Sequence, residues 1–101
     1  MKVTAHATIR WLERVKGMDL SEVKSEMREQ GRDWKAPGVI LRHLWKTREI
    51  DGDDIRAEIL SPFVTAAIQA GVSKIRLATA TLIIRDKNVV SVLRPDMKIS
   101  R

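Results

Sequence analysis

The feature that most constrains this sequence is a change of hydrophobic period near residue 72. Before that point, apolar side chains recur every three or four residues, which is typical of amphipathic helices. Beyond it, Ile75 alternates with Lys74 and Arg76, and the segments that follow are rich in Val, Ile and Thr. We therefore predict a single α+β domain over residues 1–101. Its N-terminal helices would pack on a C-terminal three-stranded antiparallel sheet, with a helical insert between them.

Five helices are expected before the change of period. Their predicted ranges are 4–16, 19–30, 39–49, 53–60 and 62–70. Thr4 is expected to cap the first helix, and Asp19 and Glu22 to form a capping box at the start of the second. Asp53 or Asp54 can cap the fourth helix.

The fifth helix has a clear predicted start at Ser61-Pro62. Serine is a good cap, and proline favours the first helical position. The inner face of this helix is expected to comprise Phe63, Val64, Ala67 and Ile68.

Three strands are expected after residue 72, and their predicted ranges are 73–78, 80–85 and 89–94. A break near residues 78–79 would separate the first two strands. Asp86-Lys87-Asn88 suits a hairpin turn, because Asp and Asn tolerate turn geometry. Pro95 is expected to end the third strand. These turns predict an antiparallel meander.

The net charge of +6 is concentrated in the sheet region. Residues 72–101 hold seven Lys or Arg and two Asp, whereas residues 1–71 hold twelve Lys or Arg and eleven Asp or Glu. A basic surface of this kind indicates an anionic partner, most often nucleic acid. A modest net charge also simply keeps small domains soluble. The residues predicted to contact nucleic acid are Lys74, Arg76, Arg85 and Arg94.

Several classes of site find no support in the sequence. The chain has no cysteine, which excludes disulfides, zinc ribbons and a cysteine nucleophile. It has two histidines, no glycine-rich loop after a strand, and no apolar run near the roughly 18 residues that span a membrane. No cofactor, no metal and no membrane association is therefore expected. The expected location is cytoplasmic, because no secretory signal is visible.

The first predicted helix places four side chains that can carry chemistry on one face. His6, Arg10, Glu13 and Arg14 are spaced for this. An imidazole can take a proton from an RNA 2′-hydroxyl or give one to the leaving oxygen, and guanidinium groups stabilise the charge on the phosphorane. Glu13 can act as a base or pair with an arginine. The alternative is an ordinary solvated helix face with i,i+3 ion pairs.

Other candidate residues have simpler interpretations. His43 lies within a predicted helix and is interpreted as structural. Trp11, Trp34 and Trp45 are either stacking platforms for bases or, as we expect in a domain with one Phe and no Tyr, sources of core volume.

The first helix reads H-A-x-x-R-x-x-E-R over residues 6–14, and the last strand reads Val89-Val90-Ser91-Val92-Leu93 before Arg94 and Pro95. These segments resemble the barnase/RelE-like superfamily of small, toxin-type ribonucleases. The resemblance covers residues 3–31 and 72–95. It implies a small α+β domain that cleaves RNA, with His6, Arg10, Glu13 and Arg14 at the site.

The sequence therefore predicts a small basic domain that binds RNA and cleaves it by metal-independent acid–base chemistry. One alternative is a non-enzymatic module that binds nucleic acid. Another is an accessory protein of a phage or mobile element, which binds a protein partner through the insert at 39–60. The apolar residues behind that alternative are Ile40, Leu41, Leu44, Trp45, Ile50 and Ile55. The oligomeric state is left open.

Overall fold

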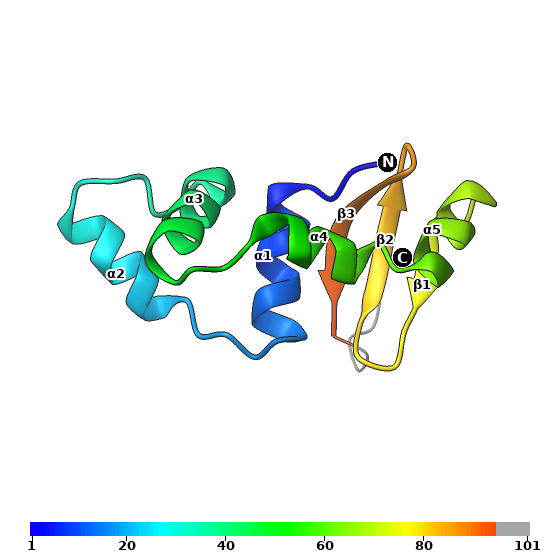
Figure 1. Cartoon of the computed structure of the whole chain (residues 1–101), viewed down its shortest axis with the longest axis horizontal. Helices are drawn as coiled ribbons and strands as arrows, with labels where there is room; N and C mark the ends of the chain where they lie inside the picture. The colour runs from blue at the N-terminus through cyan, green and yellow to red at the C-terminus, as the bar shows by residue number, and fades with distance from the viewer. Residues whose placement is uncertain (95–101) are drawn as a thin grey trace, which may run out of the picture.

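Eight secondary-structure elements follow one another in a computed structural model that describes residues 1–94 (Figure 1). The five helices are α1 (Ala5–Arg14), α2 (Ser21–Glu29), α3 (Pro37–Thr47), α4 (Gly52–Ile59) and α5 (Pro62–Gln69). The three strands are β1 (Lys74–Arg76), β2 (Thr81–Arg85) and β3 (Asn88–Leu93). The predicted α+β class, with helices packed on a C-terminal antiparallel sheet, is confirmed. Pro95, the predicted end of the third strand, lies outside the described residues.

The sheet is an antiparallel meander in the order β1-β2-β3. A tight turn joins the first two strands, where the backbone N–H of Leu77 donates to the carbonyl oxygen of Ala80 at 2.7 Å. Asp86 and Lys87 form the second turn with φ of 51° and 61°, as a two-residue hairpin with right-handed strand twist requires. Both predicted turns are confirmed.

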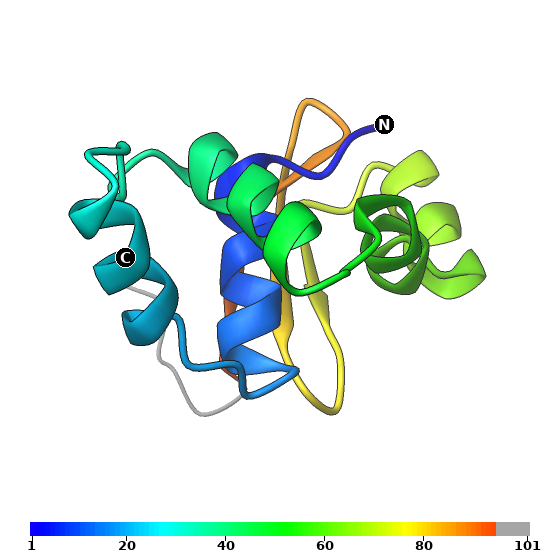
Figure 2. The same ribbon diagram turned by 60° about the vertical axis from the view of Figure 1, so that its left-hand side comes forward.

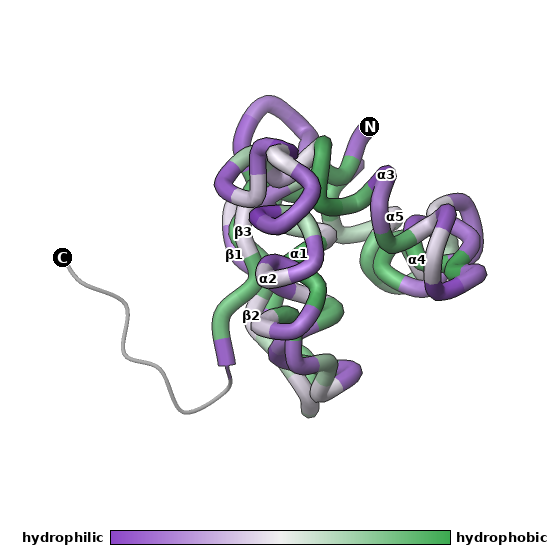
Figure 3. The backbone as a smooth tube through the Cα atoms, turned by 90° about the vertical axis from the view of Figure 1, so that its left-hand side faces the viewer, coloured by the Kyte–Doolittle hydropathy of each residue, from purple (hydrophilic) through white to green (hydrophobic). Residues whose placement is uncertain are grey.

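One face of the sheet is covered by helices, and Figure 3 shows α4 and α5 together on that side. The covered face carries the buried side chains of Ile75, Leu82, Ile84, Val89 and Val92. The alternation of a strand sends the intervening side chains, such as Lys74 and Ile83, to the other face. The sheet therefore has one apolar face that helices cover, and a second face that carries Lys74, Arg76 and Arg85.

Helix α1 connects the two halves of the molecule. It lies between the sheet and the α2–α3 pair (Figure 2). Ala7 and Leu12 are almost completely buried in this position. The residues before α1 run along β3, where Val3 bridges to Val89 and the Thr4 N–H donates to the Val89 carbonyl at 3.0 Å. The chain start therefore occupies the outer edge of β3.

The helix caps confirm one prediction and correct two. The Thr4 hydroxyl accepts the Ala7 N–H at 3.1 Å and caps α1, as expected. Asp19 is not the N-cap of α2, because the helix begins at Ser21 and its cap is Leu20. Asp19 lies one residue before the cap, where its carboxylate accepts the Ser21 N–H at 2.9 Å. Neither Asp53 nor Asp54 caps α4, because Asp51 accepts the Asp53 N–H at 2.9 Å.

Helix α5 confirms its predicted cap and corrects its predicted inner face. The Ser61 hydroxyl accepts the Val64 N–H at 3.3 Å, and Pro62 opens the helix. Val64 and Ile68 are buried one turn apart, but Phe63 is 65% exposed. Phe63 precedes Val64 by one residue, about 100° around the helix, so it falls beside the buried stripe and not within it.

Candidate functional site

Three polar side chains form a strip along α1. His6 is exposed, while Arg10 and Glu13 are partly buried. The helix buries Ile9 and Leu12 on another side, so residues at positions 6, 10 and 13 are left on a common outer face. An ion pair of 3.0 Å joins Arg10 Nη1 to Glu13 Oε1. The strip is therefore already organised before any ligand is present.

The strip forms one wall of a cavity of about 240 Å³. We call this cavity the α1 pocket. Its lining comprises His6, Ile9, Arg10 and Glu13 of α1, Lys24 of α2, Trp34, Lys35 and Pro37 around the α2–α3 connection, and Ile40 of α3. The α2–α3 pair thus turns a helix surface into a pocket.

The indole of Trp34 is the aromatic element of the α1 pocket. Its ring is partly buried, and the Arg28 guanidinium lies 4.5 Å from the ring centroid. The Lys35 ammonium lies 5.2 Å from the same centroid. Cations at these distances are attracted by the ring quadrupole and hold the ring in place. Lys35 also lines the pocket, so the indole and a positive charge are presented together.

The charge of the α1 pocket is strongly positive. Glu13 contributes a carboxylate to the lining, but this group is already paired with Arg10. Lys24 and Lys35 also line the pocket, and neither makes an ion pair with another residue of the range 1–94. A guanidinium has five donors, so Arg10 keeps donors for a ligand while it holds Glu13. The pocket is chemically suited to an anion with a planar ring.

Arg14 does not line the α1 pocket. Its Nη1 donates to the Val92 carbonyl oxygen at 2.7 Å and ties α1 to β3. Burial of the guanidinium lowers the pKa of Arg14, and the positive charges of Arg10 and Arg94 lower it further. Arg14 thus binds the backbone of β3 outside the α1 pocket, and its predicted role beside a phosphate stays a prediction.

The predicted nucleic-acid contacts on the sheet fall into two groups. Arg94 follows β3, and its positive charge lowers the pKa of Arg14. Lys74, Arg76 and Arg85 are exposed on β1 and β2, and none of them lines the α1 pocket. The structure thus brings together His6, Arg10 and Glu13 and leaves the three strand cations apart.

Sequence reasoning missed Lys24 and Lys35. Its interpretation of Trp34 as core volume agrees with the packing of this side chain against the core, but Trp34 also lines the pocket. The run Asp33-Trp34-Lys35 could have indicated this site, because it places an aromatic residue next to a cation in a loop. Its position against α1 depends on how the α2–α3 pair packs, which local spacing does not reveal.

His43 is structural, as predicted. It is 2% exposed, and its Nδ1 lies 3.1 Å from Arg32 Nη1. Because a guanidinium only donates, Nδ1 must accept, which leaves the ring proton on Nε2 to be donated to Glu26 Oε2 at 3.1 Å. Arg48 also binds Glu26, at 2.9 Å. This network joins α2 to α3 and fixes the chain just before Trp34.

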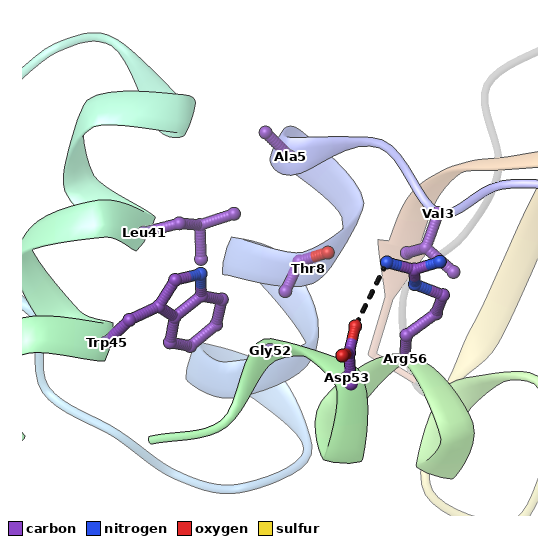
Figure 4. Close-up of a pocket in the computed structure, with 8 residues that line it drawn as sticks. All are labelled: Val3, Ala5, Thr8, Leu41, Trp45, Gly52, Asp53 and Arg56. Atoms are coloured by element: carbon purple, nitrogen blue, oxygen red, sulfur yellow. Dashed lines mark hydrogen bonds and ion pairs between the residues drawn. The ribbon is translucent and has the colours of Figure 1, made fainter. Parts of the chain in front are cut away.

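A second cavity, of about 280 Å³, touches a different face of α1 (Figure 4). We call it the Trp45 pocket. Its lining comprises Val3, Ala5, Thr8, Leu41, Trp45, Gly52, Asp53 and Arg56. An ion pair in its wall joins Asp53 Oδ1 to Arg56 Nη2 at 3.2 Å, and both side chains are mostly exposed. The lining of this pocket is about equally polar and apolar, and it has no excess of positive charge.

The apolar surplus of the insert does not form a surface patch. Ile40, Leu41, Leu44 and Ile55 are buried in the core, and Trp45 and Ile50 pack against it. The observation that suggested a protein partner for the 39–60 insert is therefore explained by packing.

No protein-family model, no curated protein and no solved structure matches the chain. The resemblance to small ribonucleases therefore stays a prediction. Over residues 1–94, no helix is long and apolar enough to cross a membrane, and no three His, Cys, Asp or Glu side chains are grouped as metal ligands.

Proposed function

We propose that the α1 pocket binds a single-stranded RNA segment. The observation that carries this proposal is the combination of an indole with positively charged side chains from three separate parts of the chain. Trp34 offers a ring face or edge to an unpaired base, and Lys24, Lys35 and Arg10 offer donors to its phosphates. A cavity of about 150 Å³ accommodates benzene. The α1 pocket has a volume of about 240 Å³, so it admits a planar base.

Single-stranded RNA suits this pocket better than a duplex does. An aromatic platform works only on bases that are free of their pairing partners. The pocket lies in a corner between α1, α2 and the connection to α3, where a splayed base can enter. Phosphate contacts by flexible lysines carry no sequence information, so we expect weak base preference and strong dependence on salt.

A second candidate function is metal-independent cleavage of the bound RNA. The observation that favours it is that His6 and Glu13, two groups able to move protons, line the same cavity as Arg10. One group would take the proton of the 2′-hydroxyl as that oxygen attacks the phosphorus. The other would protonate the departing 5′-oxygen, which leaves a 2′,3′-cyclic phosphate. Arg10 would stabilise the charge on the phosphorane.

Binding is tested with a fluorescein-labelled oligouridylate and fluorescence anisotropy over a range of salt concentrations. The variant with both Lys24→Ala and Lys35→Ala should bind more weakly, and its salt slope should fall by roughly 0.7 for each phosphate that is no longer neutralised. Lys46→Ala is the matched control, because Lys46 is exposed on α3 and does not line the pocket. Equal affinity of the double variant and the wild type would refute the proposal.

Cleavage is tested on the same oligonucleotide in the presence of a metal chelator. Wild type should release fragments that end in a cyclic phosphate, and His6→Ala and Glu13→Gln should each stop this release while binding persists. A wild-type protein that binds the oligonucleotide and leaves it intact rules out cleavage and leaves the binding proposal standing.

A further inference from the structure

The free edge of the sheet is the feature of the molecule that the RNA proposal leaves unexplained. Strand β1 pairs with β2 on one side, with Lys74 opposite Ile83 and Arg76 opposite Thr81. Hydrogen bonds to β2 come from the residues on either side of these two: the Ile84 N–H donates to Ser73 at 2.9 Å and the Leu77 N–H to Ala80 at 2.7 Å. In an antiparallel ladder the bonding direction alternates, so the N–H and C=O groups of Lys74 and Arg76 point outward.

The opposite edge of the sheet is not free in the same way. Val3 bridges to Val89 there, and the Val89 N–H donates to the Lys2 carbonyl at 2.8 Å. Among the strands of residues 1–94, β1 therefore presents the row of outward backbone groups that a further strand can use.

The face of the sheet that carries Lys74 and Arg76 is basic along that edge. Across the sheet, the row of Lys74 continues with Ile83 and Ser91, and the row of Arg76 continues with Thr81 and Leu93. Neither row contains a carboxylate. Both cations are exposed, so any strand added beside β1 places its own side chains next to them.

These charges decide which strand can be added. If the β1 strands of two molecules paired in antiparallel fashion about Ile75, Lys74 of each molecule would lie opposite Arg76 of the other. Like charges directly opposite are destabilising, so the edge rejects a second copy of itself. The same two cations favour a strand with acidic side chains at alternate positions. Lys74 and Arg76 thus repel a second copy of β1 and attract an acidic strand.

A pocket lies at the amino-terminal end of β1. It has a volume of about 280 Å³ and is lined by Ile68 of α5, by Val72 just before the strand, and by Ile84 of β2. Asp86 and Lys87 of the hairpin turn complete its rim with opposite charges. Val72 is 38% exposed, so its side chain is accessible at this pocket. A pocket beside a free edge is how strand-adding sites choose a side chain of the peptide.

We propose that β1 takes up an extended acidic segment of a partner protein as a fourth, antiparallel strand. The segment pairs its backbone with Lys74 and Arg76, places carboxylates beside their side chains, and inserts an apolar side chain in the pocket at Val72. This site is separate from the α1 pocket and does not depend on RNA binding.

The probe for this site is a fluorescein-labelled peptide, Leu-Glu-Val-Glu-Val-Glu-Leu, with blocked ends. Binding is followed by anisotropy, and hydrogen exchange of individual amides locates it. The Lys74 and Arg76 amides should exchange at least about tenfold more slowly with the peptide bound, because each gains a hydrogen bond. The backbone N–H groups of the glutamate residues face β1 in this register, so N-methylation of these backbone nitrogens should abolish binding. A methylated peptide that binds equally well overturns the proposal, as does a failure of the unmethylated peptide to bind.

Variants separate the parts of the site. Replacing Lys74 and Arg76 together by Glu should weaken binding about tenfold, since two attractive cross-strand pairs become repulsive. Val72→Ser should also weaken it, whereas Phe63→Ser, which removes an exposed apolar group outside the pocket, should not. Circular dichroism checks that each variant is folded.

Nucleic acid is the competing occupant of these cations. If the oligouridylate slows exchange of the Lys74 and Arg76 amides, or if their double replacement by Glu abolishes its binding, the edge serves RNA and the peptide proposal is wrong. If the peptide binds and the oligouridylate binds nowhere, the RNA proposal fails while this one holds.

Discussion

The two pockets beside α1 have similar volumes and each contains a tryptophan, yet they differ in what surrounds the indole. In the α1 pocket, cations lie over Trp34 and line the cavity around it. In the Trp45 pocket, the indole rests against the backbone of Gly52, and the cation of the lining, Arg56, is paired with Asp53. Both indoles are partly buried and pack against the core. The difference lies in the neighbouring charge, which residue counts do not report.

The largest predicted effect concerns the support of the α1 pocket. His43→Ala removes a buried ring that bonds Arg32 and Glu26, so we expect the free energy of unfolding to fall by about 2–4 kcal/mol. RNA affinity should fall too, because the chain just before Trp34 is no longer fixed. Urea denaturation followed by circular dichroism measures the first effect. His6→Ala is the control, because an exposed residue should change stability by no more than about 0.5 kcal/mol. Equal losses in the two variants would contradict the buried network.

The next effect tests whether the Trp45 pocket is a packing feature. A Cβ at Gly52 would lie 3.0 Å from Cε2 and Cζ2 of Trp45, so Gly52→Val forces the indole to move. We expect a loss of about 1–3 kcal/mol in the free energy of unfolding, with RNA affinity unchanged. Gly38→Ala in α3 is the matched control, because its new Cβ meets no atom within 4 Å. That variant should be slightly more stable, by about 0.4–1 kcal/mol. A Gly52→Val protein as stable as wild type would show that the Trp45 pocket is loosely packed.

A pair of tryptophan variants addresses the comparison most directly. Trp34→Leu should lower RNA affinity roughly tenfold, because a stacked base contributes about 1–3 kcal/mol. Trp45→Leu should leave RNA affinity unchanged, because this side chain does not line the α1 pocket. Both variants should lower the urea midpoint, because both indoles pack against the core. Anisotropy and urea denaturation on both variants measure the two outcomes. If both variants lose RNA affinity equally, the distinction between the pockets is wrong.

The elements of the fold could be predicted because their signals are local. Thr4, Ser61 and the turn at Asp86 act on the two or three residues that follow them, and the structure confirms each. The errors at Asp19 and Asp53 have a common cause. An aspartate binds a backbone N–H two residues ahead whether it is a cap, as Asp51 is, or the residue before one, as Asp19 is, so an aspartate alone does not mark the first residue of a helix.

The composition of the candidate site could be predicted only along α1. His6, Arg10 and Glu13 share a helix face, and helical spacing alone places them together. Lys24 and Trp34 reach the same cavity because α2 and α3 pack beside α1, and that packing depends on contacts between distant residues. The sequence also could not predict that Lys74, Arg76 and Arg85 lie away from this pocket. Strand alternation predicts which residues share a face of the sheet, but the direction of that face depends on how the helices pack.

The smallest predicted effect is a pH dependence of stability that comes from the network supporting the α1 pocket and not from the Trp45 pocket. Hydrogen bonds from Arg48 and then from His43 lower the pKa of Glu26 below its ordinary value. Because the folded pKa is the lower one, this stabilisation is present above the unfolded glutamate pKa of about 4.3 and is lost as the pH falls through the folded value. Urea midpoints measured between neutral and acidic pH should therefore fall less steeply for Glu26→Gln than for wild type, and the two proteins should converge in acid. Asp53→Asn, which removes the carboxylate of the Trp45 pocket, should keep the wild-type slope, because that ion pair is open to solvent. An equal change of slope in both variants would mean that the acid sensitivity comes from the surface at large and not from the network that supports the α1 pocket.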